Sequence, residues 1–159
     1  MKKNIFLVLG VLALSISAHA NKGVNDLNVY PPVKKDQNRN VIVLEPKENE
    51  DDYRVLITAS IEGMQDCNTK SRSAKYTEKV VEGMQYPYYE VGKIGDVVTT
   101  LMGCSEMPQM GEIPINLSGN TILRYNSKLP IVVYASNGIK INSKIFKLEE
   151  IKKSKVLND

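Results

Sequence analysis

The feature that most constrains the fold is an alternation of apolar and polar side chains in short segments of the chain. Between Arg54 and Ile61, the odd-numbered residues are apolar and most of the even-numbered ones are polar. A period of two is typical of a half-buried β-strand. Further strand-like segments, most of them separated by Gly or Asn, cover residues 76–81, 86–91, 113–117, 121–125, 129–135 and 139–148. This pattern predicts an all-β fold, an antiparallel sandwich or barrel.

Other local patterns refine this prediction. The Asn137-Gly138 pair favours a type I′ turn, so its flanks, residues 131–134 and 139–141, are expected to pair as a β-hairpin. Residues 21–40 are polar and turn-rich, which predicts an N-terminal arm. Helical periodicity is almost absent, and a helical turn is expected only around residues 148–153. No internal repeat or linker divides the chain.

The first 20 residues have the pattern of a secretory signal. Lys2 and Lys3 precede an apolar run over residues 5–16, and Ala18 and Ala20 flank a cleavage site. Cleavage there leaves residues 21–159 as a single exported domain. No later segment approaches the ~20 apolar residues that a transmembrane helix needs, so no membrane partner is expected.

Composition excludes several classes of function. The chain has 21 Lys and Arg against 18 Asp and Glu, and loss of Lys2 and Lys3 brings the net charge close to zero, which argues against a nucleic-acid partner. His19 is the only histidine and leaves with the signal, so histidine-dependent hydrolases are excluded. No metal-ligand or nucleotide-binding pattern is present, so no metal and no cofactor are predicted. An enzyme that uses carboxylates alone remains an alternative.

The two cysteines point to one disulfide. An even count in an exported chain favours a bridge between Cys67 and Cys104. In the chain-entropy model, such a bridge removes about 3.5 to 4 kcal/mol of unfolded-state freedom. It would also stiffen residues 97–102, which are extended by composition. A stiff segment that displays Leu101 suits a substrate-like protease inhibitor, because little entropy is lost on docking; the alternative is a core strand that ends at a structural disulfide.

Several short motifs give the chain a family resemblance. They are Tyr30-Pro31, Asp66-Cys67, Glu82-Gly83, Tyr88-Tyr89, the Thr-Leu-Met-Gly-Cys segment at 100–104, and the run Leu-Arg-Tyr-Asn-Ser-Lys-Leu-Pro-Ile-Val-Val-Tyr at 123–134. With them, the chain resembles the ecotin family, bacterial periplasmic inhibitors of trypsin-fold serine proteases. The likeness covers nearly all of residues 21–159 and implies a periplasmic protease inhibitor that is not an enzyme.

The resemblance implies roles for the residues before Cys104. Leu101 would fill the primary specificity pocket of the protease, and Met102 would follow it across the bond presented for cleavage. The family commonly has Met at the first of these positions. Val98, Thr99 and Thr100 would lie along the non-primed side of the cleft, and Asn68 and Thr69 would support the segment across the disulfide. For Thr99 and Thr100, simple strand propensity is the alternative.

The resemblance also implies a second protease contact made by two loops. These loops correspond to Met84, Gln85 and Tyr86 and to Arg124, Asn126, Lys128 and Leu129. Met84 stands where the family pattern has Trp, which predicts a weaker or differently tuned contact. For the neighbouring tyrosines at 88 and 89, we favour core packing over protease contact. For Arg124 and Lys128, the alternative to protease contact is an ordinary solvated surface charge.

Finally, the resemblance implies a homodimer. Two chains would exchange C-terminal strands within residues 129–148, so that one dimer binds two proteases. Residues 105–120 depart from the family pattern and leave the role of that loop open. The competing interpretation is a secreted β-sandwich module that binds a peptide, a glycan or a surface protein without inhibiting anything.

Overall fold

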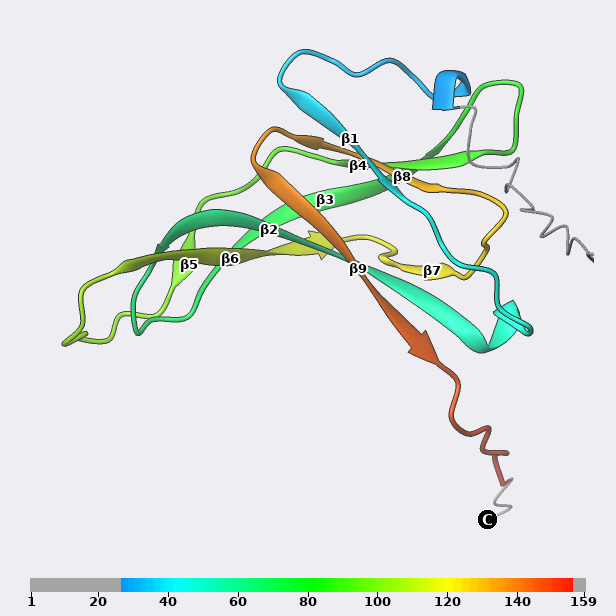
Figure 1. Cartoon of the computed structure of the whole chain (residues 1–159). Helices are drawn as coiled ribbons and strands as arrows, with labels where there is room; N and C mark the ends of the chain where they lie inside the picture. The colour runs from blue at the N-terminus through cyan, green and yellow to red at the C-terminus, as the bar shows by residue number, and fades with distance from the viewer. Residues whose placement is uncertain (1–26, 156–159) are drawn as a thin grey trace, which may run out of the picture.

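The protein is described by a computed structural model over residues 27–155, so the predicted signal segment lies outside the described residues. These residues form a strongly curled β-sheet (Figure 1). Within them, no helix is long and apolar enough to cross a membrane. Short 3-10 helices, η1 (Leu27–Val29) and η2 (Glu50–Asp52), precede the first two strands. The strands are β1 (Gln37–Ile42), β2 (Tyr53–Gln65), β3 (Lys70–Val80), β4 (Pro87–Val91), β5 (Val98–Thr99), β6 (Gln109–Ser118), β7 (Ile122–Arg124), β8 (Ile131–Ser136) and β9 (Ile139–Lys147).

The strand order confirms the all-β prediction and changes one detail. The sheet runs β1-β8-β4-β3-β6-β2-β7, with β5 on β3 and β9 on β2. The strands were expected to be antiparallel throughout, whereas β3 with β6 and β4 with β8 pair in parallel. These parallel pairs lie far apart in the sequence, where a long connection allows the chain to return in the same direction.

The alternation in β2 reflects burial on one face. Val55, Ile57 and Ala59 are all buried, and they belong to the main hydrophobic core inside the curled sheet. Tyr76 stacks on Tyr89 in the same core, with ring centroids 5.2 Å apart. The packing prediction for Tyr89 is therefore confirmed. Other members of this cluster come from β3, β4, β6, β7, β8 and β9: Ala74, Val91, Ile115, Leu123, Ile131, Val133, Ala135 and Ile139.

Strand β8 is buried on both of its faces. Val133 faces the main core, while Val132 and Tyr134 face a second apolar cluster that also contains Tyr30. Leu27 packs against this second cluster. Burial on both faces explains why the apolar run in β8 is continuous rather than alternating. The expected N-terminal arm is thus partly folded, because it covers β8 and then forms β1.

The predicted hairpin at Asn137-Gly138 is wrong. Strand β8 pairs with β1 and β4, whereas β9 pairs with β2 from Ile139 opposite Ile61 to Lys147 opposite Tyr53. Of the two turn residues, only Gly138 has a positive φ, of 85°. That pattern fits a type II turn, which splays its flanking strands, whereas type I′ needs a positive φ at both positions. The turn therefore leads the chain from β8, which lies beside β1 and β4, to β9, which lies beside β2.

The C-terminal helical turn is also absent from the described residues. Residues 148–155 have no regular secondary structure and are exposed beyond β9, and Figure 1 shows them leaving the sheet. A single turn without a packing partner is unstable in water, since helix nucleation is costly.

Candidate functional site

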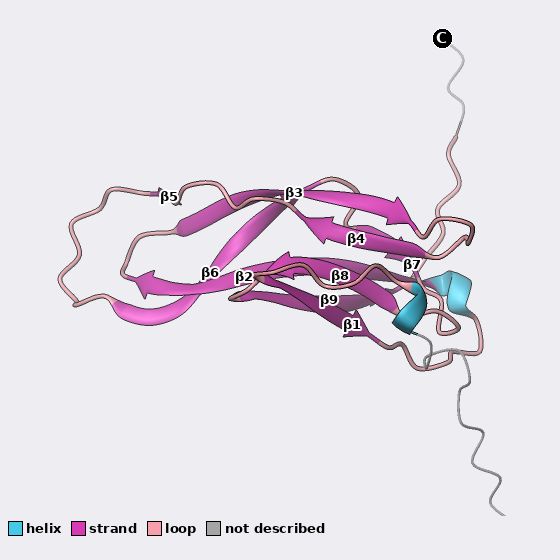
Figure 2. Cartoon of the chain, turned by 90° about the horizontal axis from the view of Figure 1, so that it is seen from above, coloured by secondary structure: helices cyan, strands magenta, loops and turns pink. Residues whose placement is uncertain are grey.

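Two connections project together from one end of the sheet. They are the turn between β2 and β3 and the long connection from β5 to β6, and both lie at the left in Figures 1 and 2. Cys67 on the first is bonded to Cys104 on the second, with 5.6 Å between their Cα atoms. The predicted disulfide is confirmed, and it ties the two connections to each other near the end of the projection.

The segment before Cys104 is fixed along one edge. Val98 lies opposite Ser71, and Thr99 lies opposite Lys70, in a short antiparallel pairing of β5 with β3. Beyond this pairing, the Thr100 N–H donates to the Thr69 carbonyl over 3.2 Å, and the Thr69 N–H donates to Thr100 Oγ1 over 3.1 Å. Only Val98–Thr99 forms a strand, so the expected extended run over 97–102 is regular in its middle alone.

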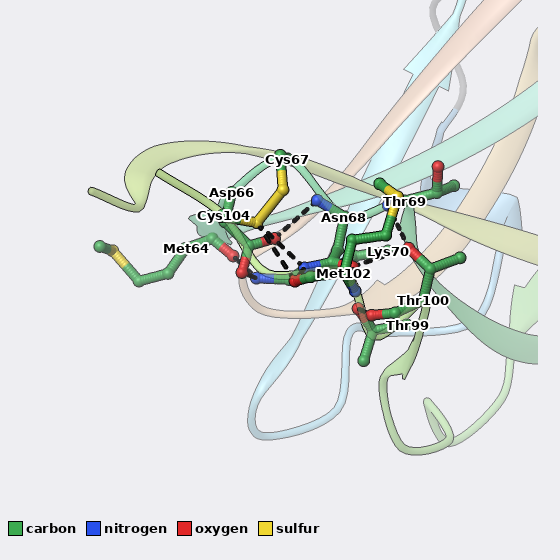
Figure 3. Close-up of a disulfide and its surroundings, with 10 residues drawn as sticks. All are labelled: Met64, Asp66, Cys67, Asn68, Thr69, Lys70, Thr99, Thr100, Met102 and Cys104. Atoms are coloured by element: carbon green, nitrogen blue, oxygen red, sulfur yellow. Dashed lines mark hydrogen bonds and ion pairs between the residues drawn. A yellow bond between two sulfur atoms is a disulfide. The ribbon is translucent and has the colours of Figure 1, made fainter. Parts of the chain in front are cut away.

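The Asn68 side chain holds the backbone on both sides of Leu101 (Figure 3). Its Oδ1 accepts a hydrogen bond of 2.9 Å from Thr100 Oγ1 and one of 2.7 Å from the Met102 N–H. Its Nδ2 donates to the Met102 carbonyl over 3.2 Å. The carboxamide uses two lone pairs and a proton for this purpose. The expectation that Asn68 and Thr69 support the segment agrees with this geometry.

Leu101 itself is free. Its side chain is 94% exposed, and Val98 and Met102 are 70% and 57% exposed. In the described part of the chain, the Leu101 N–H and C=O have no hydrogen-bond partner. Exposure of this degree excludes the alternative of a core strand, since a core strand buries its large apolar side chains.

Asp66 and Lys70 fix the turn that carries Asn68. The Asp66 carboxylate accepts a 3.0 Å hydrogen bond from the Asn68 N–H and pairs with Lys70 Nζ at 3.2 Å. Lys70 Nζ also donates to the Met64 carbonyl over 2.9 Å. The hydrogen bond from Asn68 and the Lys70 ammonium lower the pKa of Asp66. Sequence reasoning gave Asp66 and Lys70 no role, because their contacts depend on how the turn closes.

The residues of the expected second contact lie at the other end of the molecule. Met84 and Tyr86 are on the turn between β3 and β4, where Gly83 has a φ of 73° and the Val81 N–H donates to the Tyr86 carbonyl over 3.0 Å. Both side chains are partly exposed, at 44% and 38%. Gln85 occupies the same exposed turn.

The second loop of this pair connects β7 to β8. Arg124 forms an ion pair of 2.8 Å with Asp51, and the Lys128 N–H donates to Asn126 Oδ1 over 2.9 Å. Leu129 is half-buried. A hollow lined by Arg124, Asn126 and Leu129 of this loop, among others, reaches Pro87 at the start of β4. The structure places the two loops at the same end of the molecule, at the right in Figures 1 and 2 and opposite the Leu101 segment.

No group of three or more His, Cys, Asp or Glu residues arranged to hold a metal ion occurs between residues 27 and 155. The two ends of the molecule present two different surfaces. One carries an exposed apolar side chain on a backbone held by hydrogen bonds, and the other has a shallow hollow lined by charges of both signs. These are the properties of a protein that binds another protein.

Comparison with known proteins agrees with this class. A family model described as Ecotin matches residues 26–148. An ecotin of Pseudomonas putida (strain W619) is 31% identical over 150 residues, covering 92% of this chain and 94% of the relative. An ecotin of Pseudomonas fluorescens (strain Pf0-1) is 34% identical over 139 residues, or 87% of this chain and 86% of the relative. An ecotin of Yersinia pestis (strain Pestoides F) is 31% identical over 168 residues, or 98% and 99% of the two chains.

The fold defines an all-β protein with one disulfide, and the family match places it in the protease-inhibitor class. The chain belongs to the ecotin family, whose members inhibit serine proteases and are not enzymes.

Proposed function

We propose that this protein inhibits trypsin-fold serine proteases by presenting Leu101 and Met102 as a substrate-like bond. The observation that carries the proposal is the pairing of a 94% exposed Leu101 side chain with a backbone that Asn68 holds on both sides. A protease cleft needs an extended, accessible segment with a large side chain for its primary pocket. A braced segment loses little conformational entropy when it docks, so more of its contact energy appears as affinity.

The same bracing explains inhibition rather than cleavage. When the protease serine attacks the Leu101 carbonyl, the Met102 nitrogen becomes the leaving amine. The hydrogen bonds between Asn68 and Met102, together with the disulfide at Cys104, keep that amine beside the acyl group. Such proximity corresponds to a very high effective concentration of the amine, so the Leu101–Met102 bond re-forms faster than water hydrolyses the acyl-enzyme. The protein itself supplies no catalytic group.

The free edge of the segment supports strand addition. Val98 and Thr99 pair with β3 along one edge only, and the Leu101 backbone groups are unpaired in the described structure. An extended segment of this kind adds to the sheet edge of a cleft through main-chain hydrogen bonds. Val98, Thr99 and Thr100 are thus proposed to occupy the non-primed subsites.

The side chain at 101 selects the protease. Leucine suits an apolar pocket of the chymotrypsin kind and leaves the buried carboxylate of a trypsin pocket unpaired. We infer tighter inhibition of chymotrypsin-like and elastase-like enzymes than of trypsin.

The opposite placement of the two surfaces supports a dimeric inhibitor. A single chain directs the Leu101 segment and the 84–86 and 124–129 loops away from each other (Figure 1), so a protease that touches both must meet two chains. Two linked contacts raise the effective concentration and add about 10² to 10⁴ in avidity. In this proposal, a dimer binds two proteases.

The C-terminal segment is the proposed dimer contact. Within one chain, β9 pairs with β2, yet Ile145, Phe146, Leu148 and Ile151 remain 47–77% exposed. A second copy that exchanges or covers this segment would bury these side chains. The exchange itself is a proposal, because the single chain satisfies β9 without it. Export to the periplasm through the signal at 1–20 is proposed likewise.

The test is titration of chymotrypsin and neutrophil elastase with the protein lacking residues 1–20, beside a Leu101→Asp variant. Strong inhibition by the parent and marked loss in the variant would support substrate-like binding at Leu101. Inhibition unchanged by the substitution would move the binding energy to the second contact. No inhibition of any trypsin-fold protease would favour a binding module without inhibitory activity.

A further inference from the structure

The contacts of Asn68 raise the question of what orients Asn68. An asparagine side chain on a turn has two rotatable bonds, and its three contacts to Thr100 and Met102 need one particular orientation. The disulfide at the neighbouring Cys67 fixes the distance between the two connections, and its Cys104 Sγ accepts a 3.2 Å hydrogen bond from Asn68 Nδ2. These contacts hold the far end of the Asn68 side chain, and the backbone from which the side chain departs needs a partner of its own.

Asp66 is placed for that purpose. Its Oδ1 accepts the Asn68 N–H over 3.0 Å, which fixes the backbone from which the Asn68 side chain departs. Its Oδ2 lies 3.2 Å from Lys70 Nζ. The Asp66 and Lys70 side chains are only 20% and 15% exposed, so the pair is better shielded from solvent than an ordinary surface ion pair.

Lys70, the first residue of β3, connects this arrangement to strands β2 and β5. Its Nζ donates to the Met64 carbonyl near the end of β2 over 2.9 Å, while its backbone lies opposite Thr99 in β5. Figure 3 shows these residues gathered around the disulfide. The contacts form a continuous path from Lys70 through Asp66 and Asn68 to the peptide that follows Leu101.

We propose that Asp66 is a positioning residue of the Leu101 segment: its carboxylate, held by Lys70, orients Asn68, which in turn fixes the Leu101–Met102 bond. This inference rests on the proposed function, because it assigns Asp66 a part in keeping that bond resistant to cleavage. Asp66 touches neither Leu101 nor the residues placed against a protease. Its effect therefore passes through Asn68.

The variants separate the contribution of the hydrogen bond from that of the charge. Asp66→Ala removes the acceptor for the Asn68 N–H and the partner of Lys70. Asp66→Asn keeps an acceptor oxygen and removes the charge. Asp96→Ala is the matched control, since Asp96 is an exposed aspartate on the connection before β5. Thermal unfolding of every variant checks that the fold is retained.

The first readout is amide hydrogen exchange in the protein alone. The Met102 N–H, bonded to Asn68 Oδ1, is expected to exchange about tenfold faster or more in Asp66→Ala, with a smaller change in Asp66→Asn and none in Asp96→Ala. Exchange of buried β8 amides provides the internal reference. Because no protease is present, this readout tests Asp66 even if the parent protein does not inhibit.

The second readout is the rate at which chymotrypsin cleaves the Leu101–Met102 bond, measured by mass spectrometry. Asp66→Ala is expected to be cleaved about tenfold faster or more than the parent, and Asp66→Asn is expected to restore most of the resistance. Met102 exchange and cleavage that are both unchanged in a folded Asp66→Ala protein would overturn the proposal. If Asp66→Ala speeds Met102 exchange while the parent inhibits no protease, the positioning role is supported and the proposed function is refuted.

Discussion

Asn68 and Met102 are joined by two hydrogen bonds that run in opposite directions. The Met102 N–H donates to Asn68 Oδ1 over 2.7 Å, and Asn68 Nδ2 donates to the Met102 carbonyl over 3.2 Å. A carboxamide side chain here does what a neighbouring β-strand would do, because it satisfies both backbone groups of one residue. The bond between Leu101 and Met102 is held without a strand on either side of it.

Removing this side chain should convert the loop from an inhibitor toward a substrate. Asn68→Ala loses three hydrogen bonds to Thr100 and Met102 and a fourth to Cys104 Sγ, and we expect the inhibition constant for chymotrypsin to rise about tenfold or more. Cleavage between Leu101 and Met102 should accelerate in parallel. Asn68→Asp keeps the acceptor and loses the donor, so it should fall between the parent and Asn68→Ala. An alanine variant that inhibits as well as the parent would contradict the prediction.

Changing the displayed side chain should redirect the inhibitor. Leu101→Arg introduces a cation that pairs with the carboxylate of a trypsin pocket and is unfavourable in an apolar one. The ratio of the inhibition constants for trypsin and chymotrypsin should shift by about 100-fold or more toward trypsin. Met102→Leu, a change of similar size at the next position, is the control and should leave that ratio nearly unchanged. Equal ratios in the two variants would argue against Leu101 as the specificity residue.

Loss of the disulfide should destabilise the whole domain. The bridge joins residues 37 apart in the sequence, and the Cys67→Ser, Cys104→Ser double variant should lose about 3.5 to 4 kcal/mol of unfolding free energy in the chain-entropy model. Denaturant unfolding followed by tyrosine fluorescence measures the change. Reduction of the parent protein should give a similar loss, and an unchanged midpoint in both cases would contradict the prediction.

A core truncation tests the curled sheet. Ile57 in β2 is only 2% exposed, so Ile57→Ala should cost about 2 to 5 kcal/mol of unfolding free energy. Ile122→Ala is the matched control, because Ile122 lies on β7 and is 57% exposed. The control should change stability by no more than about 0.5 kcal/mol. Similar losses in the two variants would be inconsistent with the burial described here.

An ion network on the outer face should make stability depend on acid pH. Hydrogen bonds from Lys140 and then Ser60, at 3.0 Å each, lower the pKa of Glu112. A carboxyl whose pKa is lower in the folded state stabilises fully above its ordinary pKa of 4.5, and the effect is lost as pH falls through the folded value. The melting temperature of the parent should exceed that of Glu112→Gln at pH 7. The difference should close as the pH falls below 4.5 and through the lower folded-state pKa, and a constant difference would contradict this cause.

The sequence predicted the strands better than it predicted their partners. Alternation identified β2 because Val55, Ile57 and Ala59 all face a single core. The same information does not fix topology, since Asn137-Gly138 is compatible with more than one turn type. Asn137 does not have the positive φ that a type I′ turn needs, and the turn instead leads β9 to a distant partner. Its partner is β2, some 80 residues earlier in the chain.

The sequence likewise predicted some features of the candidate site and missed others. The position of Leu101 before Cys104 and the disulfide followed from sequence patterns and the resemblance. The contacts of Asp66 and Lys70 did not, because a carboxylate and an ammonium four residues apart on a turn are ordinary surface charges until the turn closes. Their partners, the Asn68 N–H and the Met64 carbonyl, are backbone groups that leave no signature in a sequence.

Strand β3 connects the two ends of the molecule without a break. It begins at Lys70, beside the Asn68 turn, and ends at Val80, beside the turn that carries Met84. Eleven residues of strand span about 35 Å at the usual rise per residue, so the length of β3 sets the separation of the two surfaces. Two residues inserted into β3 and its neighbours would increase this separation and keep every side chain on its face of the sheet. A single inserted residue would move every later side chain of the strand to the opposite face. The reach of the inhibitor is therefore free to change only in steps of two residues.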